Sequence, residues 1–435
     1  MWLGGFEWLV VRDGDGDRAT GGLMRNDLVT GSSQRFRSLS QGARSAGSGP
    51  CGKARSAWRA PTSMLWQAAP DRVELNRQAD CGSISSDEDE TLDIGIGSAV
   101  AQGKRAQAGA VDAGLPGLEA LRRIHAGRSP QPPIHYWSGR RLVALQHGGA
   151  SISMPASGWF CGPKGQLHPG IFAFLLDMTH LYAVMSTLPA GAGCTTAELS
   201  VTVLGQPPAS GAEIIGRSRV IYSDERNALA EGLVVDQGGH PVAHSTSRYF
   251  LFAPGAVVPP RSSEQFPQAR SPGTGAMLRE RVPQIAPVGP ELLQRLSGLE
   301  ILAAQIKGEI PAAPIGRYAG IRPVEAGDGR VVFSLPVHPD LVQELGTVFG
   351  GVIALLAKSA SGAAVQTIAP AGTGFTALDL KVNFLRPARA EGDELIATGL
   401  VSHRGRRLSI ANAVVTYRGR RIAVATGTTA LTPPK

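Results

Sequence analysis

One carboxylate lies in the middle of a long apolar stretch, where its surroundings point to chemistry. The stretch runs from His168 to Met185, and its only acidic residue is Asp177. We expect a single helix that is apolar almost all round, and a helix of that kind is buried. Burying a carboxylate is costly unless the group is paired or hydrogen-bonded. Asp177 is therefore either a well-satisfied structural group that caps nearby backbone or a reacting group.

Several other kinds of functional site are excluded by the sequence. It contains no Gly-x-Ser-x-Gly elbow, and no Lys-Ser or Lys-Thr follows the pair Gly350-Gly351 as a phosphate loop would require. The cysteines are scattered and form no Cys-x-x-Cys pair, which argues against a disulfide framework or a metal site: Cys51, Cys81, Cys161 and Cys194. Isolated cysteines fit a reducing compartment, so we expect a cytoplasmic protein.

Composition and charge narrow the class of partner. With 43% hydrophobic residues and no apolar run of eighteen or more, the chain is expected neither to span nor to bind a membrane. No secretory signal is visible. The net charge of +8 falls in residues 111–435, because residues 1–110 hold 13 basic and 13 acidic side chains. This thinly spread charge is either a solvated surface or an attraction for a small polyanion such as a phosphate-bearing molecule. No nucleic-acid-binding motif accompanies it.

The first quarter of the chain differs from the rest. Residues 1–112 are rich in Gly, Ser, Ala and Arg, and they include the acidic run Ser86-Asp-Glu-Asp-Glu90. Such a composition indicates disorder. We expect either a disordered N-terminal extension or a translation start placed too far upstream; a transit peptide is a weaker alternative because acidic residues are frequent.

The remainder of the chain repeats itself with an offset of 181 residues. The register holds without a gap for about 120 residues and slips by one near Gly238. Matching positions include Gly117 with Gly298, Pro133-Ile134 with Pro314-Ile315, Gly170 with Gly351, Pro189-Ala-Gly191 with Pro370-Ala-Gly372, Leu199 with Leu380, and Glu213 with Glu394. The sequence therefore predicts two copies of one domain, 113–253 (the first repeat) and 290–435 (the second repeat), joined by a linker at 254–289.

Both repeats show the same order of expected elements. A short amphipathic helix (118–126; 299–307) and a proline-bearing turn precede two strands (141–146 and 150–154; 321–325 and 330–335). The apolar helix follows (170–186; 351–367), and then long alternating strands (195–204, 213–223, 227–236 and 241–252; 376–385, 394–403, 407–417 and 420–431). A buried helix followed by a strand meander predicts an α+β fold, with an antiparallel sheet wrapped round the helix.

Two stretches of the second repeat carry a resemblance to a known family. The segments Gly346–Lys358 (GTVFGGVIALLAK) and Leu380–Ala388 (LKVNFLRPA) resemble the hotdog-fold acyl-CoA thioesterases of the PaaI-like, phenylacetic-acid-degradation type. The resemblance implies tandem hotdog domains that pair edge to edge as a pseudo-dimer within one chain. It also implies composite sites: one unit gives a mid-helix acid and a strand hydroxyl, and the other gives an amide before its helix and a glycine N–H at the helix start.

Carried over position by position, the family's site is complete in only one of its two possible copies. Asp177 and Thr196 of the first repeat would combine with Gln343 and Gly350 of the second, so that all four roles are filled. In the reciprocal site all four are lost, because the matching residues are Lys358, Ala377, Gly162 and Pro169. The resemblance therefore implies one intact site and one degenerate site per chain.

The implied chemistry is thioester hydrolysis. Asp177 would act as general base on water or as nucleophile, and Thr196 would orient the water or the carboxylate. The N–H of Gly350 would stabilise the oxyanion, whereas Pro169 has no N–H to offer. Gln343 replaces the usual Asn with a longer arm. Each also has a structural explanation: β-propensity for Thr196, a loop amide for Gln343 and turn geometry for Gly350.

Further residues are expected to bind substrate. They are His168, Gly351, Arg386, Arg404 and Arg407, the arginines being candidates for the phosphates of coenzyme A together with Arg389. His168 can equally be a buried hydrogen-bonded histidine, and the Arg404–Arg407 segment a charged hairpin turn. Lys358 is either a relic that snorkels out of a dead pocket or an anion-binding group.

Taken together, the sequence and the resemblance predict an acyl-CoA thioesterase that releases a free acid and coenzyme A. No metal and no cofactor is expected, since coenzyme A enters only as part of the substrate. The alternatives are a catalytically inactive acyl-CoA-binding protein and a purely structural partner. Acyl-CoA is the expected partner, and the family's assemblies suggest a homodimer with four hotdog units.

Overall fold

The computed structural model describes residues 114–129, 131–205, 212–254, 288–343, 346–389 and 392–433. These residues belong to one structural unit, Ser85–Lys435. The expected N-terminal extension, 1–112, and most of the expected linker, 254–289, lie outside the described residues. The boundaries of the two repeats stay predictions.

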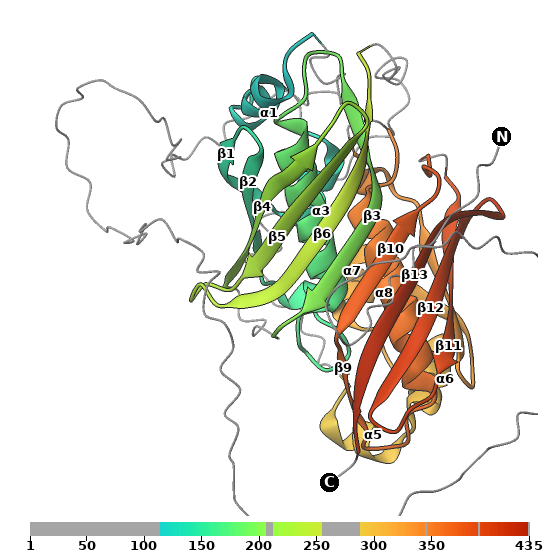
Figure 1. Cartoon of the computed structure of the whole chain (residues 1–435). Helices are drawn as coiled ribbons and strands as arrows, with labels where there is room; N and C mark the ends of the chain where they lie inside the picture. Colours follow the sequence, from blue (N-terminus) through green and yellow to red (C-terminus); the bar gives the residue numbers. More distant parts are fainter. Residues whose placement is uncertain are drawn as a thin grey trace, which may run out of the picture. The chain divides into compact units, whose positions relative to one another are not determined.

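The two repeats build the same succession of elements (Figure 1). In the first repeat they are α1 (Gly117–His125), α2 (Pro133–Ser138), β1 (Arg141–Gln146), β2 (Gly149–Pro155), α3 (Pro169–Met185), β3 (Gly193–Val203), β4 (Glu213–Ser223), β5 (Asn227–Val235) and β6 (Pro241–Phe252). In the second they are α5 (Pro290–Arg295), α6 (Gly298–Lys307), α7 (Pro314–Ala319), β7 (Arg322–Gly327), β8 (Arg330–Pro336), α8 (Gly350–Thr367), β9 (Gly374–Ala377), β10 (Asp379–Phe384), β11 (Glu394–His403), β12 (Leu408–Tyr417) and β13 (Arg420–Thr432).

The strands of both repeats join into one antiparallel sheet within the described residues. Its order is β1-β2-β4-β5-β6-β3-β10-β13-β12-β11-β8-β7, with β9 paired to β13 alone. The repeats meet where β3 pairs with β10, for example at Val201 with Leu380 and at Leu199 with Val382 (Figure 1). The expected edge-to-edge pseudo-dimer of hotdog domains is therefore confirmed, and the fold class is α+β.

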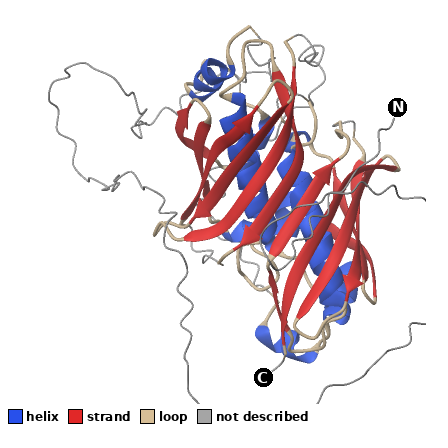
Figure 2. Cartoon of the chain, in the orientation of Figure 1, coloured by secondary structure: helices blue, strands red, loops and turns tan. Residues whose placement is uncertain are grey.

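The two apolar helices lie against this sheet and against each other (Figure 2). Helix α3 packs on β2 to β6, and α8 packs on β8 and on β10 to β13. Nearly every residue of both helices is buried, which explains their apolar sequences. Glycines allow the close contact between them: a Cβ on Gly170 would lie 2.6 Å from Leu355 Cδ1, and one on Gly351 would lie 2.8 Å from Phe174 Cα.

The structure differs from the expected elements in three places. The proline-bearing turns are short helices, α2 and α7, because proline at the first helical position already has helical φ. Helix α5 was not predicted. The expected strand 376–385 is divided after β9, where the Asp379 carboxylate accepts the N–H of Thr428 at 2.7 Å and replaces a backbone partner.

None of the described helices combines the length and the apolar character needed to cross a membrane.

Candidate active site

Asp177 lies in the middle of α3 with only 1% of its surface exposed. Two side chains from neighbouring strands hold it. Thr196 Oγ1, on β3, donates to the Asp177 carboxylate at 2.9 Å, and the Tyr249 hydroxyl, on β6, donates to the Asp177 backbone carbonyl at 3.2 Å. Thr196 and Tyr249 are register partners in the sheet, so the strand pairing itself brings both hydroxyls to the helix.

The other side of the carboxylate faces the second repeat. A Cβ built on Gly350, the first residue of α8, would lie 2.7 Å from Asp177 Oδ2, so only glycine leaves room for the carboxylate here. The backbone N–H of Gly351 donates to the same carboxylate. An anion is stabilised at a helix N-terminus by the unpaired N–H groups and by the helix dipole. The carboxylate from one repeat is thus seated on the helix start of the other, as expected.

Burial and hydrogen bonding act in opposite directions on this acid. Desolvation raises the pKa of Asp177 to about 7, and the hydrogen bonds from Thr196, Gly351 and Tyr249 partly offset that rise. A general base works best when its pKa lies near the operating pH. A pKa near 7 therefore suits Asp177 to accept a proton near neutral pH.

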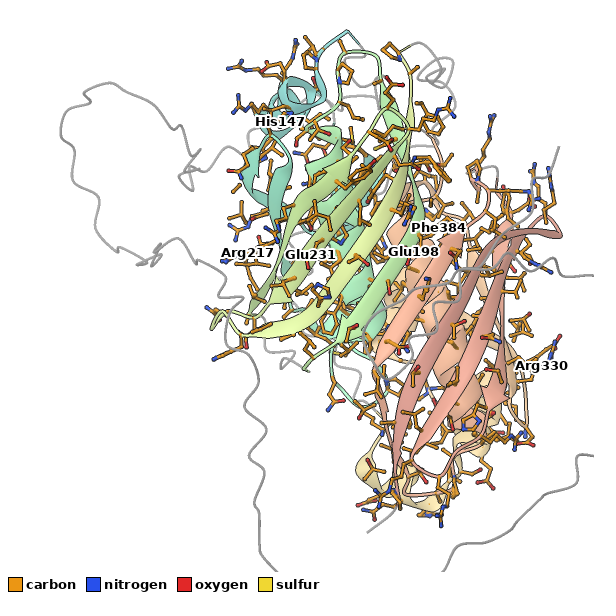
Figure 3. The ribbon with its side chains drawn as sticks, in the orientation of Figure 1. His147, Glu198, Arg217, Glu231, Arg330 and Phe384 are labelled. Atoms are coloured by element: carbon orange, nitrogen blue, oxygen red, sulfur yellow. The ribbon has the colours of Figure 1, made fainter. Side chains whose placement is uncertain are left out.

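The N–H of Gly350 makes no hydrogen bond to another described residue. It lies beside the carboxylate at the positive end of α8. This N–H can donate a hydrogen bond to the oxygen of a substrate carbonyl group while the carbonyl carbon faces the Asp177 carboxylate. Phe384 of β10 closes the same space, since its Cε1 lies 3.6 Å from a Cβ built on Gly350; Figure 3 labels it near Glu198 at the β3–β10 junction.

Gln343 is engaged elsewhere. Its Nε2 donates to Thr347 Oγ1 at 2.9 Å, and its backbone N–H donates to the Thr347 carbonyl at 3.0 Å. The hydrogen bonds that set the pKa of Asp177 come from Thr196, Gly351 and Tyr249 and not from this amide. The structure brings Asp177, Thr196 and Gly350 together. Gln343 lies in the loop before α8, as expected, and its catalytic role stays a prediction.

The four residues of the expected degenerate site also meet. Gly162, Pro169, Lys358 and Ala377 line one cavity between the loop before α3 and the second repeat. Lys358 takes the place of the acid and is 3% exposed. At the start of α3, Pro169 has no N–H, and the N–H of Gly170 donates to His168 Nδ1 at 3.1 Å. The first three residues of α3 therefore offer no free N–H.

His168 belongs to that second cleft. Its ring lines the Lys358 cavity and caps α3. Asp177 lies nine residues further along the helix, about 13 Å away at 1.5 Å per residue. The structure thus places His168 apart from the Asp177 carboxylate, whereas Gly351 contacts it directly.

The arginines separate into two groups. Arg386 follows β10 closely and donates to the Arg421 carbonyl at 2.7 Å, and Arg389 bridges to Thr347 just before α8. Both therefore lie near the chain segments that enclose Gly350. Arg404 instead pairs with Asp328 at 2.7 Å, and the neighbouring Gly329 bonds Thr367 at the far end of α8.

Arg407 is also remote from Gly350 along the sheet. It precedes β12, and its carbonyl accepts the N–H of Leu431 close to the C-terminal end of β13. Helix α8 runs from Gly350 to Thr367, about 26 Å at 1.5 Å per residue. The structure accordingly does not bring Arg404 to the Gly350 end of the helix, and Arg407 has no contact that does so.

Tyr249 is the residue of this site that sequence reasoning missed. It is fully buried, and burial raises its pKa well above the ordinary value, so it stays a neutral donor. Its counterpart in the second repeat is Thr429, which pairs with Ala377 as Tyr249 pairs with Thr196. In the sequence, the match of Tyr249 with Thr429 is visible only after allowing for the one-residue slip of the repeat near Gly238.

No group of three or more potential ligands for a metal occurs among the described residues. Cys161 and Cys194 are both buried free thiols. The site as described consists of a carboxylate, two hydroxyls and a helix N-terminus.

Comparison with known proteins identifies a family and several similar proteins. The model of the thioesterase superfamily matches residues 345–425. The curated protein named "Putative esterase VNG_1336C", from Halobacterium salinarum, is 32% identical over 114 residues, which are 25% of this chain and 74% of that protein.

Solved structures are similar to one repeat or to both. A thioesterase family protein from Silicibacter pomeroyi is 28% identical and covers 30% of this chain and 97% of its own, with a TM-score of 0.28. A structure from Novosphingobium aromaticivorans, named a putative thioesterase, covers 67% of this chain and 98% of its own at 15% identity, with a TM-score of 0.43. On the match of its second repeat and the identity to the Halobacterium protein, the chain belongs to the thioesterase superfamily.

Proposed function

We propose that the chain hydrolyses an acyl-CoA thioester to a free acid and coenzyme A, at one composite site per chain. The observation that carries the proposal is the seating of the buried Asp177 carboxylate on the N-terminus of α8, a helix of the other repeat. Within the superfamily, the Gly-Gly helix start and the Val-Asn-Phe-Leu-Arg-Pro strand favour the PaaI-like type.

The residues of the site would have two kinds of role: some stabilise charge or transfer a proton, and others hold the reacting groups in position. The thioester carbonyl oxygen would accept the N–H of Gly350, where the helix dipole stabilises the negative charge that develops on it. Asp177, with a pKa near 7, would then take a proton from water or attack the carbonyl carbon itself. Thr196 and Tyr249 hold the carboxylate and its helix in place. Arg386 and Arg389 would meet the phosphates of coenzyme A.

The acyl group is proposed to be small. In the first repeat Arg140 packs on the ring of Tyr182 at 4.7 Å, and its Nη2 lies 2.8 Å from His135 Nε2. The offset of 181 residues places these three side chains at the positions of Ile321, Ala363 and Gly316, which line the Lys358 cavity. Bulky groups therefore occupy, beside Asp177, the space that remains open beside Lys358.

The test is a thiol-trapping assay on the full chain with acyl-CoA esters that range from acetyl to palmitoyl and include aryl-CoA esters. We expect thiol release from short or small acyl groups, falling as the chain lengthens. Absence of thiol release from every ester would contradict hydrolysis.

A second candidate function is acyl-CoA binding without hydrolysis. The observation in its favour is the open cavity at the cleft that lacks the acid. It predicts a shift in melting temperature with acyl-CoA but no thiol release, so the same panel of esters separates the two functions.

A further inference from the structure

The cleft that has lost the expected catalytic residues holds a partly open cavity of about 140 Å³. It lies between the loop before α3 and the helices α6, α7 and α8 of the second repeat. Its walls are largely apolar and include Leu302, Ile315, Ile321, Phe333 and Ala363. An apolar cavity of roughly 150 Å³ is large enough to bind benzene, so this one has room for a short acyl chain or a single ring.

A buried ammonium group faces this cavity. Lys358 is 3% exposed, and its Nζ donates to the backbone carbonyl of Asp379 at 3.0 Å. No ion pair of Lys358 with a carboxylate is found among the described residues. Burial lowers the pKa of Lys358 to about 8, and the nearby Asp379 charge partly offsets that lowering. An ammonium has three donors, and the Asp379 carbonyl takes one. Burying a charge without a counter-ion is costly, so the cavity is electrostatically incomplete.

His168 adds a second donor to the same wall. Burial and the Lys358 charge lower the pKa of His168 to about 3, so its ring is neutral. Because Nδ1 accepts the N–H of Gly170, the proton must be on Nε2. Lys164 also lines the cavity, with its Nζ 3.8 Å from the centre of the Phe375 ring. Every ionisable group on the wall is therefore a cation or a donor, and none is an acid.

We propose that this cavity binds the carboxylate of a small apolar acid, with the carboxylate on Lys358 and His168 and the apolar part against the α6–α8 wall. A free carboxylate has no thioester to hydrolyse, so the site needs neither the N–H that Pro169 lacks nor the hydroxyl that Ala377 lacks. Acids of this class are also what the proposed hydrolysis releases, but the binding does not depend on that reaction.

Calorimetric titration of the full chain with sodium hexanoate tests the proposal. We expect one binding event per chain, at least tenfold weaker binding of 1-hexanol, which lacks the charge, and no binding of inorganic phosphate. Lys358→Met should weaken hexanoate binding at least tenfold. Lys307→Met, which removes an exposed lysine from the end of α6, is the matched control and should leave it unchanged.

A second variant fills the cavity instead of removing the charge. Ala363→Tyr introduces the side chain that the first repeat carries at the matching position, Tyr182, and should abolish hexanoate binding. Melting temperatures and thiol release are measured on every variant. Lost hexanoate binding with unchanged thiol release supports a separate site, whatever the outcome for hydrolysis. Unchanged hexanoate binding in Lys358→Met, or its loss in Asp177→Asn, would overturn the proposal.

Discussion

The two clefts between the repeats are built from equivalent backbone elements but carry different side chains. The first combines Asp177, Thr196 and Tyr249 with the glycine start of α8; the second has Lys358, Ala377 and Thr429 with the proline start of α3. The first lacks open space where Arg140, His135 and Tyr182 pack together, whereas the second retains a cavity there. The comparison teaches that this fold does not require an acid at the middle of the helix. Asp177 is therefore best explained by chemistry.

Substitutions at the first residue of α8 and of α3 should give the largest difference in thiol release between the two clefts. Gly350→Ala places a methyl group 2.7 Å from the present position of Asp177 Oδ2, so the carboxylate must move off the helix N-terminus. Alanine is a good helix former, so α8 should still form. We expect thiol release to fall roughly 10²-fold or more, the scale on which a positioned general base contributes, because the substitution displaces Asp177 while the N–H of residue 350 remains.

Pro169→Ala is the matched control, because Pro169 begins α3 as Gly350 begins α8. Its thiol release should equal that of the unmutated chain. Equal effects of the two substitutions would mean that the clefts are functionally equivalent, contrary to the asymmetry inferred from their residues.

The strand hydroxyl should have a smaller effect that depends on pH. Thr196 stabilises the ionised form of Asp177, so Thr196→Val should raise the pKa of that carboxyl further above about 7. The rate of thiol release depends on the ionised acid, so it should rise with pH through about 7 in the unmutated chain and through a higher pH in the variant. A rise of one pKa unit from about 7 lowers the ionised fraction at pH 7 from about a half to about a tenth, so the loss at that pH should be about fivefold.

Thr195→Val is the control, since Thr195 is the exposed neighbour on the same strand. A rate–pH curve of Thr196→Val that coincides with the curve of this control would show that the hydroxyl does not act on Asp177.

The last expected effect concerns stability and not rate. The pKa of Asp177 is raised on folding, so ionisation opposes folding: stability is highest below the ordinary pKa of 3.8 and is lost as pH rises to about 7. Asp177→Asn removes that loss. The stabilisation that it gives should therefore increase between pH 5 and pH 8, by up to about 3 kcal/mol.

Thermal unfolding of both proteins at these two pH values measures this difference. A melting-temperature difference that does not change with pH would contradict a raised pKa for Asp177.

The architecture could be predicted because the sequence pattern of each element occurs in both repeats. Strand alternation and the all-round apolar helices depend only on neighbouring residues, and the matching order in 113–253 and 290–435 identified the pairing of equivalent elements. The break between β9 and β10 was not predicted from the sequence. It depends on the Asp379 side chain accepting the N–H of Thr428, a contact between residues far apart in sequence.

The site was only partly predictable for the same reason. Residue type and position in the repeat pointed to Asp177, Thr196 and Gly350. No motif marks Tyr249, whose place in the site follows only from its pairing with Thr196 in the folded sheet. The Lys358 cavity depends on side-chain volumes at positions such as Gly316 and Ala363, which meet only in the folded chain. The position of Arg404 was likewise set by the β7–β8 turn that it contacts through Asp328.

The central claim is that one cleft catalyses and its pseudo-symmetric counterpart does not. The most direct test compares thiol release by Asp177→Asn and Lys358→Met, substitutions at matching positions of α3 and α8, under one set of conditions. Since general acid–base groups contribute about 10²–10⁴-fold, the account predicts a loss of that size in Asp177→Asn and an unchanged rate in Lys358→Met. Retained thiol release in Asp177→Asn, or an equal loss in both variants, would contradict it.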